Sequence, residues 1–69
     1  MSVARVVEIS STSTKSFEDA ITQGIERANE TLRNVRSAWV KEQKAQVEHG
    51  KVVAYKVNLK VTFVLDGKS

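Results

Sequence analysis

The sequence predicts an α+β fold in the order β-α-β-β, with a three-stranded antiparallel sheet wrapped on one amphipathic helix. Three observations lead to this fold class. Apolar and polar residues alternate from Val52 to Leu65, apolar residues recur with helical spacing from Phe17 to Arg33, and a turn sequence around Gly50 separates two strand-like segments. The chain has 69 residues, so residues 1–69 are expected to form a single domain.

The first strand is predicted from Val3 to Ser10. Its apolar residues lie on both faces, with Val7 and Ile9 on one side and Val6 on the other. This suggests that both sides are covered or that the strand lies near an interface. The polar segment Ser11 to Lys15 is expected to connect the strand to the helix. Its hydroxyls suit turns and caps; phosphate recognition at the helix N-terminus is the alternative, without a glycine loop to support it.

The helix is predicted from Phe17 to Arg33. Ser16 is a suitable N-cap, and Asp19 three residues later resembles the acidic partner of a capping box. The stripe that should face the sheet comprises Phe17, Ala20, Ile21, Gly24, Ile25, Ala28 and Leu32. Arg33 near the end suits the helix macrodipole. Glycine costs about 1 kcal/mol relative to alanine in a helix, and close approach of a strand would explain Gly24.

The second strand is predicted from Val35 to Val47. Its alternation is mixed, because neither its odd-numbered nor its even-numbered positions are uniformly apolar. Residues Glu48 to Lys51 then close a hairpin, in which Gly50 can adopt a positive φ. These two features place the second and third strands side by side and antiparallel.

The third strand, Val52 to Leu65, organises the rest of the chain. Its odd positions are apolar, whereas Lys56, Asn58 and Lys60 lie on the other face. Such a period of two places one face in a core and the other toward a wetter environment. At about 3.3 Å per residue the strand spans about 45 Å, which is long for a small domain. It should therefore curl strongly or reach a neighbouring subunit.

Composition indicates an oligomer. A chain this small is marginally stable by itself, and disulfides, a metal or oligomerisation are the usual remedies. The sequence has no cysteine, and His49 is its only histidine, which leaves oligomerisation. The net charge is +3, but its 11 basic and 8 acidic residues are interspersed, so a nucleic-acid partner is not expected. Neither a membrane span nor a signal peptide is recognised, and a cytoplasmic location is expected.

An enzymatic function is not expected. Catalysis needs a converging set of titratable groups, and the sequence contains no nucleophile–base pair or metal-ligand spacing. Lys56 or Glu42 would have to serve as the acid or base. A binding function is the more consistent interpretation.

Several segments together resemble the dodecin family over essentially the whole chain. They are Ser11-Thr12-Ser13 before Ser16-Phe17, Arg27-Ala28 in the helix, Asn34-Val35 at the second strand, and Val61 to Gly67. The resemblance implies a hollow homododecamer of 23 cubic symmetry that binds flavins such as riboflavin, lumichrome or FMN. Storage or sequestration of the flavin is the implied function, with no enzymatic turnover.

The same resemblance indicates an altered ligand site. Ser37 stands where flavin-binding dodecins carry a tryptophan that stacks on the isoalloxazine ring, and Lys56 stands where they carry a glutamine that hydrogen-bonds the flavin edge. Serine offers no aromatic face, and lysine can only donate. The sequence resembles the minority of dodecins that lack the stacking tryptophan, which implies calcium as a candidate ligand. The carboxylates available for calcium are Glu8, Glu42, Glu48 and Asp66.

Trp39 leaves an alternative open. It lies two residues beyond Ser37 and so on the same face of the second strand. It could stack on a displaced flavin, which would make the protein a functional flavin-binding dodecin, or pack at a subunit interface, where tryptophan is enriched. The tentative ligand-binding positions are therefore Ser37, Trp39 and Lys56.

Overall fold

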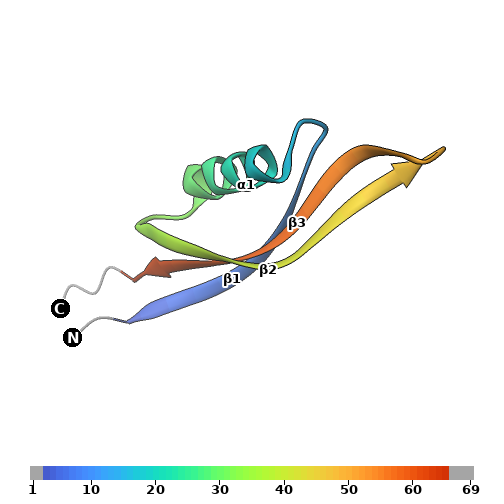
Figure 1. Ribbon diagram of the computed structural model, residues 1–69. Coiled ribbons are helices and arrows are strands. Elements are labelled where there is room, and N and C mark those ends of the chain that lie inside the picture. The colour runs from blue at the N-terminus through green and yellow to red at the C-terminus, as the bar shows by residue number, and fades with distance from the viewer. Residues whose placement is uncertain (1–2, 66–69) are drawn as a thin grey trace.

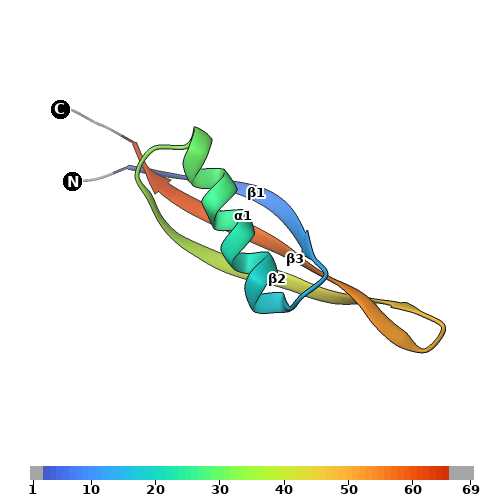
Figure 2. The ribbon, with the colours of Figure 1, turned by 90° about the horizontal axis from the view of Figure 1, so that it is seen from above.

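The computed structural model describes residues 3–65 and confirms the predicted β-α-β-β order. The elements are β1 (Ala4–Ser13), α1 (Phe17–Thr31), β2 (Val35–Glu48) and β3 (Lys51–Val64). Helix α1 lies on one face of the sheet, and the hairpin of β2 and β3 projects beyond it (Figure 1). Seen from above, the helix crosses only part of the sheet's length (Figure 2).

The sheet is fully antiparallel, with strand order β1-β3-β2. The strand with the clearest alternation, β3, is therefore central, and both outer strands pair with it. Val7 lies opposite Val61 and Ile9 opposite Leu59, so β1 adds its own apolar residues to the face that α1 covers. Residues directly opposite one another share a face, which fixes the orientation of every paired side chain.

The core lies between α1 and the odd-numbered face of β3. Val57, Leu59 and Val61 are fully buried there, together with Ala20 and Ala28 of the helix. The helical stripe and the period of two in β3 were both predicted, and the core confirms that these two faces meet. At the start of the helix, Phe17 packs edge-to-face on Tyr55, with ring centroids 5.0 Å apart.

Gly24 allows this close packing. A Cβ added to it would lie 3.1 Å from Leu59 Cδ1 and 3.1 Å from Ser11 Cβ, which is closer than side chains normally pack. Leu59 comes from β3 and Ser11 from β1, so the helix approaches two strands at this point. The predicted close approach of a strand is confirmed.

The segment that leads into α1 differs from the prediction, whereas the helix begins at Phe17 as predicted. Strand β1 continues to Ser13, where a polar connector was predicted, so the connection to α1 is shorter than expected. The buried Ser13 hydroxyl donates to Asp19 Oδ2 at 2.6 Å and accepts from the Lys15 amide at 2.9 Å. Ser16 caps the helix as predicted, because its hydroxyl accepts from the Asp19 amide at 2.9 Å. The serine run therefore ends a strand and holds the helix start.

Asp19 should make stability depend on acid pH. The hydrogen bond from Ser13 is the largest influence on Asp19 and lowers the pKa of its carboxyl below the ordinary 3.8. The hydrogen bond from Gln23 and the charge of Lys15 also lower this pKa, whereas desolvation raises it. Because the folded pKa is lower than the unfolded one, the contribution is present above about pH 4 and is lost as the pH falls through the folded pKa. Asp19→Asn should therefore lower stability at pH 7 and have a smaller effect near pH 2.

Urea unfolding of wild type and Asp19→Asn at a series of pH values measures this difference. Glu18→Gln is the matched control, since it removes an equal charge from the same helical turn without touching Ser13. If both variants show the same pH dependence, the effect comes from the helix dipole rather than from the contact between Asp19 and Ser13.

The C-terminus of α1 was predicted too far along the chain. The helix ends at Thr31, and Leu32 is its C-cap with extended dihedral angles. Arg33 lies beyond the helix, so the predicted stabilisation of the macrodipole by this residue is wrong. Asn34 then adopts a positive φ of 61°, a conformation that asparagine tolerates better than most residues. This turn brings Val35 directly into β2.

Register shifts explain the mixed alternation of β2. They occur between Val35 and Ser37 and again between Val40 and Glu42. Each shift inserts an extra residue. The residues that face the helix therefore change from odd to even positions at the first shift and back to odd positions at the second. Lys41 is the extra residue of the second shift. A simple alternation could therefore not describe this strand, although its predicted start at Val35 is confirmed.

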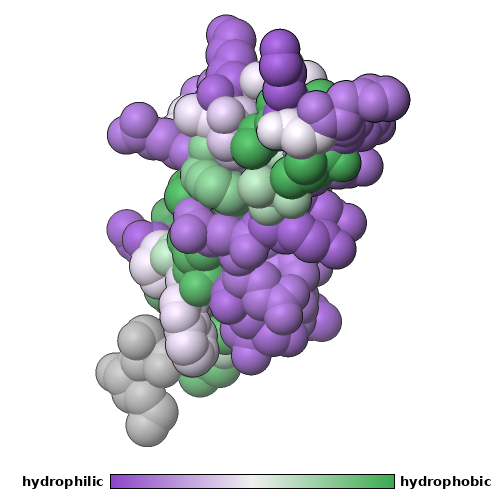
Figure 3. Space-filling view, turned by 45° about the vertical axis from the view of Figure 1, so that its right-hand side comes forward, coloured by the Kyte–Doolittle hydropathy of each residue, from purple (hydrophilic) through white to green (hydrophobic). Residues whose placement is uncertain are grey.

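The hairpin of β2 and β3 turns through His49 and Gly50, both with positive φ, at 53° and 75°. The turn was predicted at this place, and a two-residue loop with two positive φ values suits the twist of a hairpin. The arm extends past the helix, and Val47 and Val52 near its tip are exposed. Apolar surface also lies between hydrophilic side chains in the space-filling view (Figure 3). The described chain is 55 Å long and 19 Å wide.

Candidate functional site

The sheet face opposite α1, which we call the open face, carries most of the polar and aromatic candidates. The register places on it Val6, Glu8, Ser10 and Thr12 of β1, Lys56, Asn58, Lys60 and Thr62 of β3, and Ser37, Trp39, Lys41, Glu42 and Lys44 of β2. Within the described residues no helix or strand covers this face. The prediction of a wide second face bearing Lys56, Asn58 and Lys60 is confirmed.

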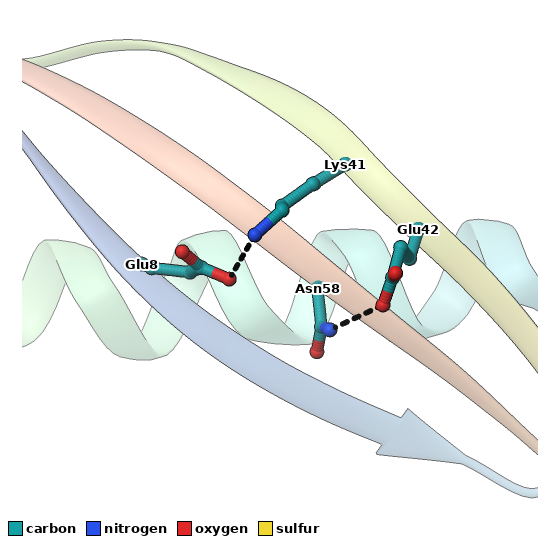
Figure 4. Close-up of polar contacts among 4 residues, drawn as sticks. All are labelled: Glu8, Lys41, Glu42 and Asn58. Carbon is teal, nitrogen blue, oxygen red and sulfur yellow. Dashed lines mark hydrogen bonds and ion pairs between the residues drawn. The ribbon is translucent and has the colours of Figure 1, made fainter.

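One part of the open face contains an ion pair. Lys41 Nζ reaches across β3 to Glu8 Oε2 at 3.2 Å, and Figure 4 shows this contact on the side of the sheet away from the helix. Lys60 lies directly opposite Glu8 on β3. Both side chains of the Lys41–Glu8 pair are nearly half exposed, so the pair contributes only about 0–1 kcal/mol. It orders the face more than it stabilises the fold.

A second polar contact joins β2 to β3. The Asn58 side-chain amide donates to Glu42 Oε1 at 3.0 Å (Figure 4). Together with Gln43, Lys44 and Lys56, these two residues line an open hollow of about 490 Å³. Lys44 lies directly opposite Lys56 across the strand pair. The hollow therefore combines two ammonium groups with one carboxylate that is already hydrogen-bonded.

Trp39 is the most exposed large apolar residue of the sheet, at 68% of its full area. The Lys60 ammonium lies 5.5 Å from the centre of its ring, a cation–π distance. A planar ligand could reach the remaining ring face directly, or the other face after displacing Lys60. Trp39 is thus available for stacking or for packing against another molecule.

The three tentative ligand positions share the open face but are not all close together. Ser37 lies opposite Thr62 and Trp39 opposite Lys60. Lys56 is six positions from Thr62 along β3, which corresponds to roughly 20 Å. One chain therefore brings Ser37 and Trp39 together and leaves Lys56 apart. A small ligand that contacts Ser37 and Lys56 at once would need residues from two chains.

The predicted calcium carboxylates do not gather into a metal site within the described residues, where no group of three potential ligands is found. Glu8 and Glu42 are held by Lys41 and Asn58, and Glu48 lies near the hairpin tip opposite Lys51. Asp66 lies outside the described residues. Calcium needs several oxygen ligands, so a site built from these carboxylates requires more than one chain.

Sequence reasoning missed Lys41 and Lys44 as site residues, and it placed Asn58 on the open face without giving it a role. The register shift at Lys41 turns both it and Glu42 toward the open face, against the alternation. The pairing of Lys44 with Lys56 depends on the same shift. The only sequence signal was the lost periodicity of β2, which indicates irregularity but not its position.

A polar sheet face that carries the exposed Trp39, backed by a single helix, defines a small α+β protein with one uncovered sheet face. A model of the dodecin family matches residues 3–66. The chain belongs to the dodecin family, as the resemblance predicted.

Three relatives illustrate this membership. The dodecin of Streptomyces davaonensis is 36% identical, with a TM-score of 0.90 over 96% of this chain and 97% of that chain. A single-residue variant of the Thermus thermophilus dodecin is 34% identical, with a TM-score of 0.90 over 97% of this chain and 100% of that chain. The calcium dodecin of Mycobacterium tuberculosis is 35% identical over 63 residues, which are 91% of this chain and 89% of that protein.

A crystal structure of the M. tuberculosis protein superimposes with a TM-score of 0.80, over 97% of this chain and 96% of that chain. It is described as calcium chelating, with a novel calcium-binding site. Dodecins are small homo-oligomeric binding and storage proteins. Among the described residues, no helix is long and apolar enough to cross a membrane.

Proposed function

We propose that the protein forms a dodecin-like homododecameric shell that binds and sequesters a small ligand or ion, with the usual flavin site altered at Ser37 and Lys56. The observation that carries the proposal is the uncovered open face, where Trp39 and Val6 are exposed at 68% and 55%. A small domain rarely leaves such a face to solvent, and a second copy of the chain is the simplest cover. Membership of a homo-oligomeric family supports the same proposal.

The first test is the mass in solution. Multi-angle light scattering should report about twelve times the 7.7 kDa of one chain, because the exposed apolar surface of the hairpin and open face would then be buried between copies. A Trp39→Lys variant should shift the mass toward smaller species if Trp39 packs between copies. A wild-type monomer at micromolar concentration would contradict the shell.

The second part of the test concerns the ligand. Wild type should bind riboflavin weakly or not at all, because Ser37 provides no stacking surface and burying the Lys56 ammonium costs several kcal/mol unless it finds a partner. Quenching of flavin fluorescence measures the affinity, with riboflavin and FMN titrated separately. Calorimetric titration with calcium chloride tests the ion. The support for calcium is the similarity to the M. tuberculosis calcium dodecin and the carboxylates that several copies could bring together.

The alternative function is flavin storage with Trp39 as the stacking residue. The exposed ring, partly covered by Lys60 at 5.5 Å, supports it. This alternative requires submicromolar riboflavin binding by the wild type that is lost in Trp39→Ala. Binding of that strength would replace the first proposal, whereas weak binding unchanged by Trp39→Ala would exclude stacking on this ring.

A further inference from the structure

We propose that the end of the β2–β3 hairpin of one copy docks in the groove between α1 and β1 of a second copy. The inference rests on the proposed shell and deepens it, because it names the two surfaces of the chain that meet. The first surface is the arm, residues 46–54. The second is the α1–β1 groove, whose floor is formed by Val7, Ile9, Ala28 and Leu32.

The arm is a two-stranded extension of a three-stranded sheet. Strand β1 ends at Ser13, opposite Tyr55 of β3, and α1 begins at Phe17, whose ring packs on the same Tyr55. Among residues 3–65, no third strand and no helix follows the hairpin beyond this point (Figure 2). From Tyr55 to Lys51 the chain reaches about 13 Å further. A hairpin of two strands is only marginally stable in water by itself, so the arm needs cover from another molecule.

The side chains of the arm are suited to burial rather than to water. Val47, Val52 and Val53 are exposed at 57%, 48% and 38%. Val47 and Val52 lie directly opposite each other across the strand pair, so their exposed surfaces adjoin. Single exposed apolar residues are ordinary, but several that adjoin on a soluble protein mark an interaction site.

The α1–β1 groove offers a matching apolar surface. It has a volume of about 530 Å³. Val7, Ile9 and Leu32 in its floor are only half-buried, so the packing of the chain itself leaves space above them. Thr31 lines the groove near the end of α1, whereas the arm projects past the start of the helix (Figure 1). The arm of the same chain therefore cannot enter the groove, and a second copy must supply it.

Charged residues beside the two surfaces are complementary. At the end of the arm, Glu48 lies directly opposite Lys51. At the rim of the groove, Arg27 lies 3.6 Å from Glu30 in an exposed pair. A docked arm can place Lys51 beside Glu30 and Glu48 beside Arg27. Rim charges of this kind contribute to orientation and specificity more than to affinity.

The arm and the groove are different surfaces, so the contact between them is heterologous. Heterologous contacts either close into rings or continue as filaments. A closed shell corresponds to the first case, in which the arm of every copy lies in the groove of a neighbour. Both apolar surfaces are then buried in every copy.

Introduced disulfides test the contact, because the chain contains no cysteine. Val52→Cys lies on the arm, and Gln23→Cys and Thr31→Cys lie along the groove. Disulfides form between Cα atoms about 4.4–6.8 Å apart. At least one of the two arm–groove combinations should therefore link each copy to the next and give a ladder of covalent oligomers on a non-reducing gel. The three single variants are controls and should remain unlinked, since identical residues do not meet in a heterologous contact.

A further substitution tests whether the arm is buried when it is linked. Val47→Asp, added to the combination that links, should slow linking by about tenfold or more, because burial of an unpaired carboxylate disfavours the docked arm. Gln46→Asp is the matched control. It adds the same charge one residue earlier, where the side chain points to the opposite face of the strand, and should slow linking much less. Equal slowing by both would contradict docking through the valines.

Light scattering under reducing conditions separates this contact from the shell. If wild type is an intact oligomer but neither combination gives a ladder, the arm–groove contact is wrong while the shell stands. Linking of Val52→Cys by itself would also overturn the contact, since it would mean that two arms meet end to end. A monomeric wild type would overturn the contact and the shell together.

Discussion

Leu59→Ala is expected to destabilise the fold by about 2–5 kcal/mol, the range for deletion of a fully buried leucine side chain. Leu59 has no exposed area and lies at the centre of the core, against the helix at Gly24 and opposite Ile9 and Val40. In a domain of this size such a loss is comparable with the whole stability. Urea unfolding followed by circular dichroism should show a large fall in the midpoint, or an unfolded variant.

Two further variants keep this prediction testable if Leu59→Ala does not fold. Leu59→Met conserves volume and should cost less than about 1.5 kcal/mol. Gly24→Ala adds a methyl group that meets Leu59 Cδ1 at 3.1 Å, and shortening Leu59 removes that contact. The combination of Leu59→Ala with Gly24→Ala should therefore be less destabilised than the sum of the two single changes. Simple additivity would contradict the close packing of α1 on β3 at this point.

Ser37→Trp combined with Lys56→Gln is expected to tighten riboflavin binding by about tenfold or more. The indole restores an aromatic face, worth about 1 kcal/mol beyond its buried area, and the amide can both donate and accept. Both positions lie on the open face and are exposed, so neither change disturbs the core. Fluorescence quenching of riboflavin measures the gain in the single and double variants.

The control is Ser10→Trp, which places a tryptophan on the same face but on β1, opposite Asn58. It should gain little riboflavin affinity. An equal gain would mean that any exposed indole captures the ring, and no gain in the double variant would mean that Ser37 and Lys56 are not the flavin positions.

The fold could be predicted because its strongest signals are local. The alternation in β3, the helical stripe and the turn at Gly50 each depend on a few neighbouring residues, and the structure confirms all three. The errors arose where distant residues decide the structure. Ser13 extends β1 because it pairs with Tyr55 and donates to Asp19, and a run of serines and threonines by itself suggests only a loop.

The candidate site was less predictable, for two physical reasons. The shift at Lys41 reverses which residues of β2 reach the open face, and the pairing of Lys44 with Lys56 follows only from the resulting register. The second reason is the separation of Ser37 from Lys56 by roughly 20 Å within one chain. Their roles depend on how copies meet, which the pattern of one sequence does not encode. They stay predictions until the titrations are made.

The central position of β3 also determines when the sheet can form during synthesis. The outer strands β1 and β2 do not pair with each other, because each of them hydrogen-bonds only to β3. The ribosome releases β1, α1 and β2 first, and until β3 emerges the two outer strands lack their common partner. Ala4 then pairs with Val64, across nearly the whole length of the chain. Formation of the native sheet therefore waits until β3 has left the exit tunnel.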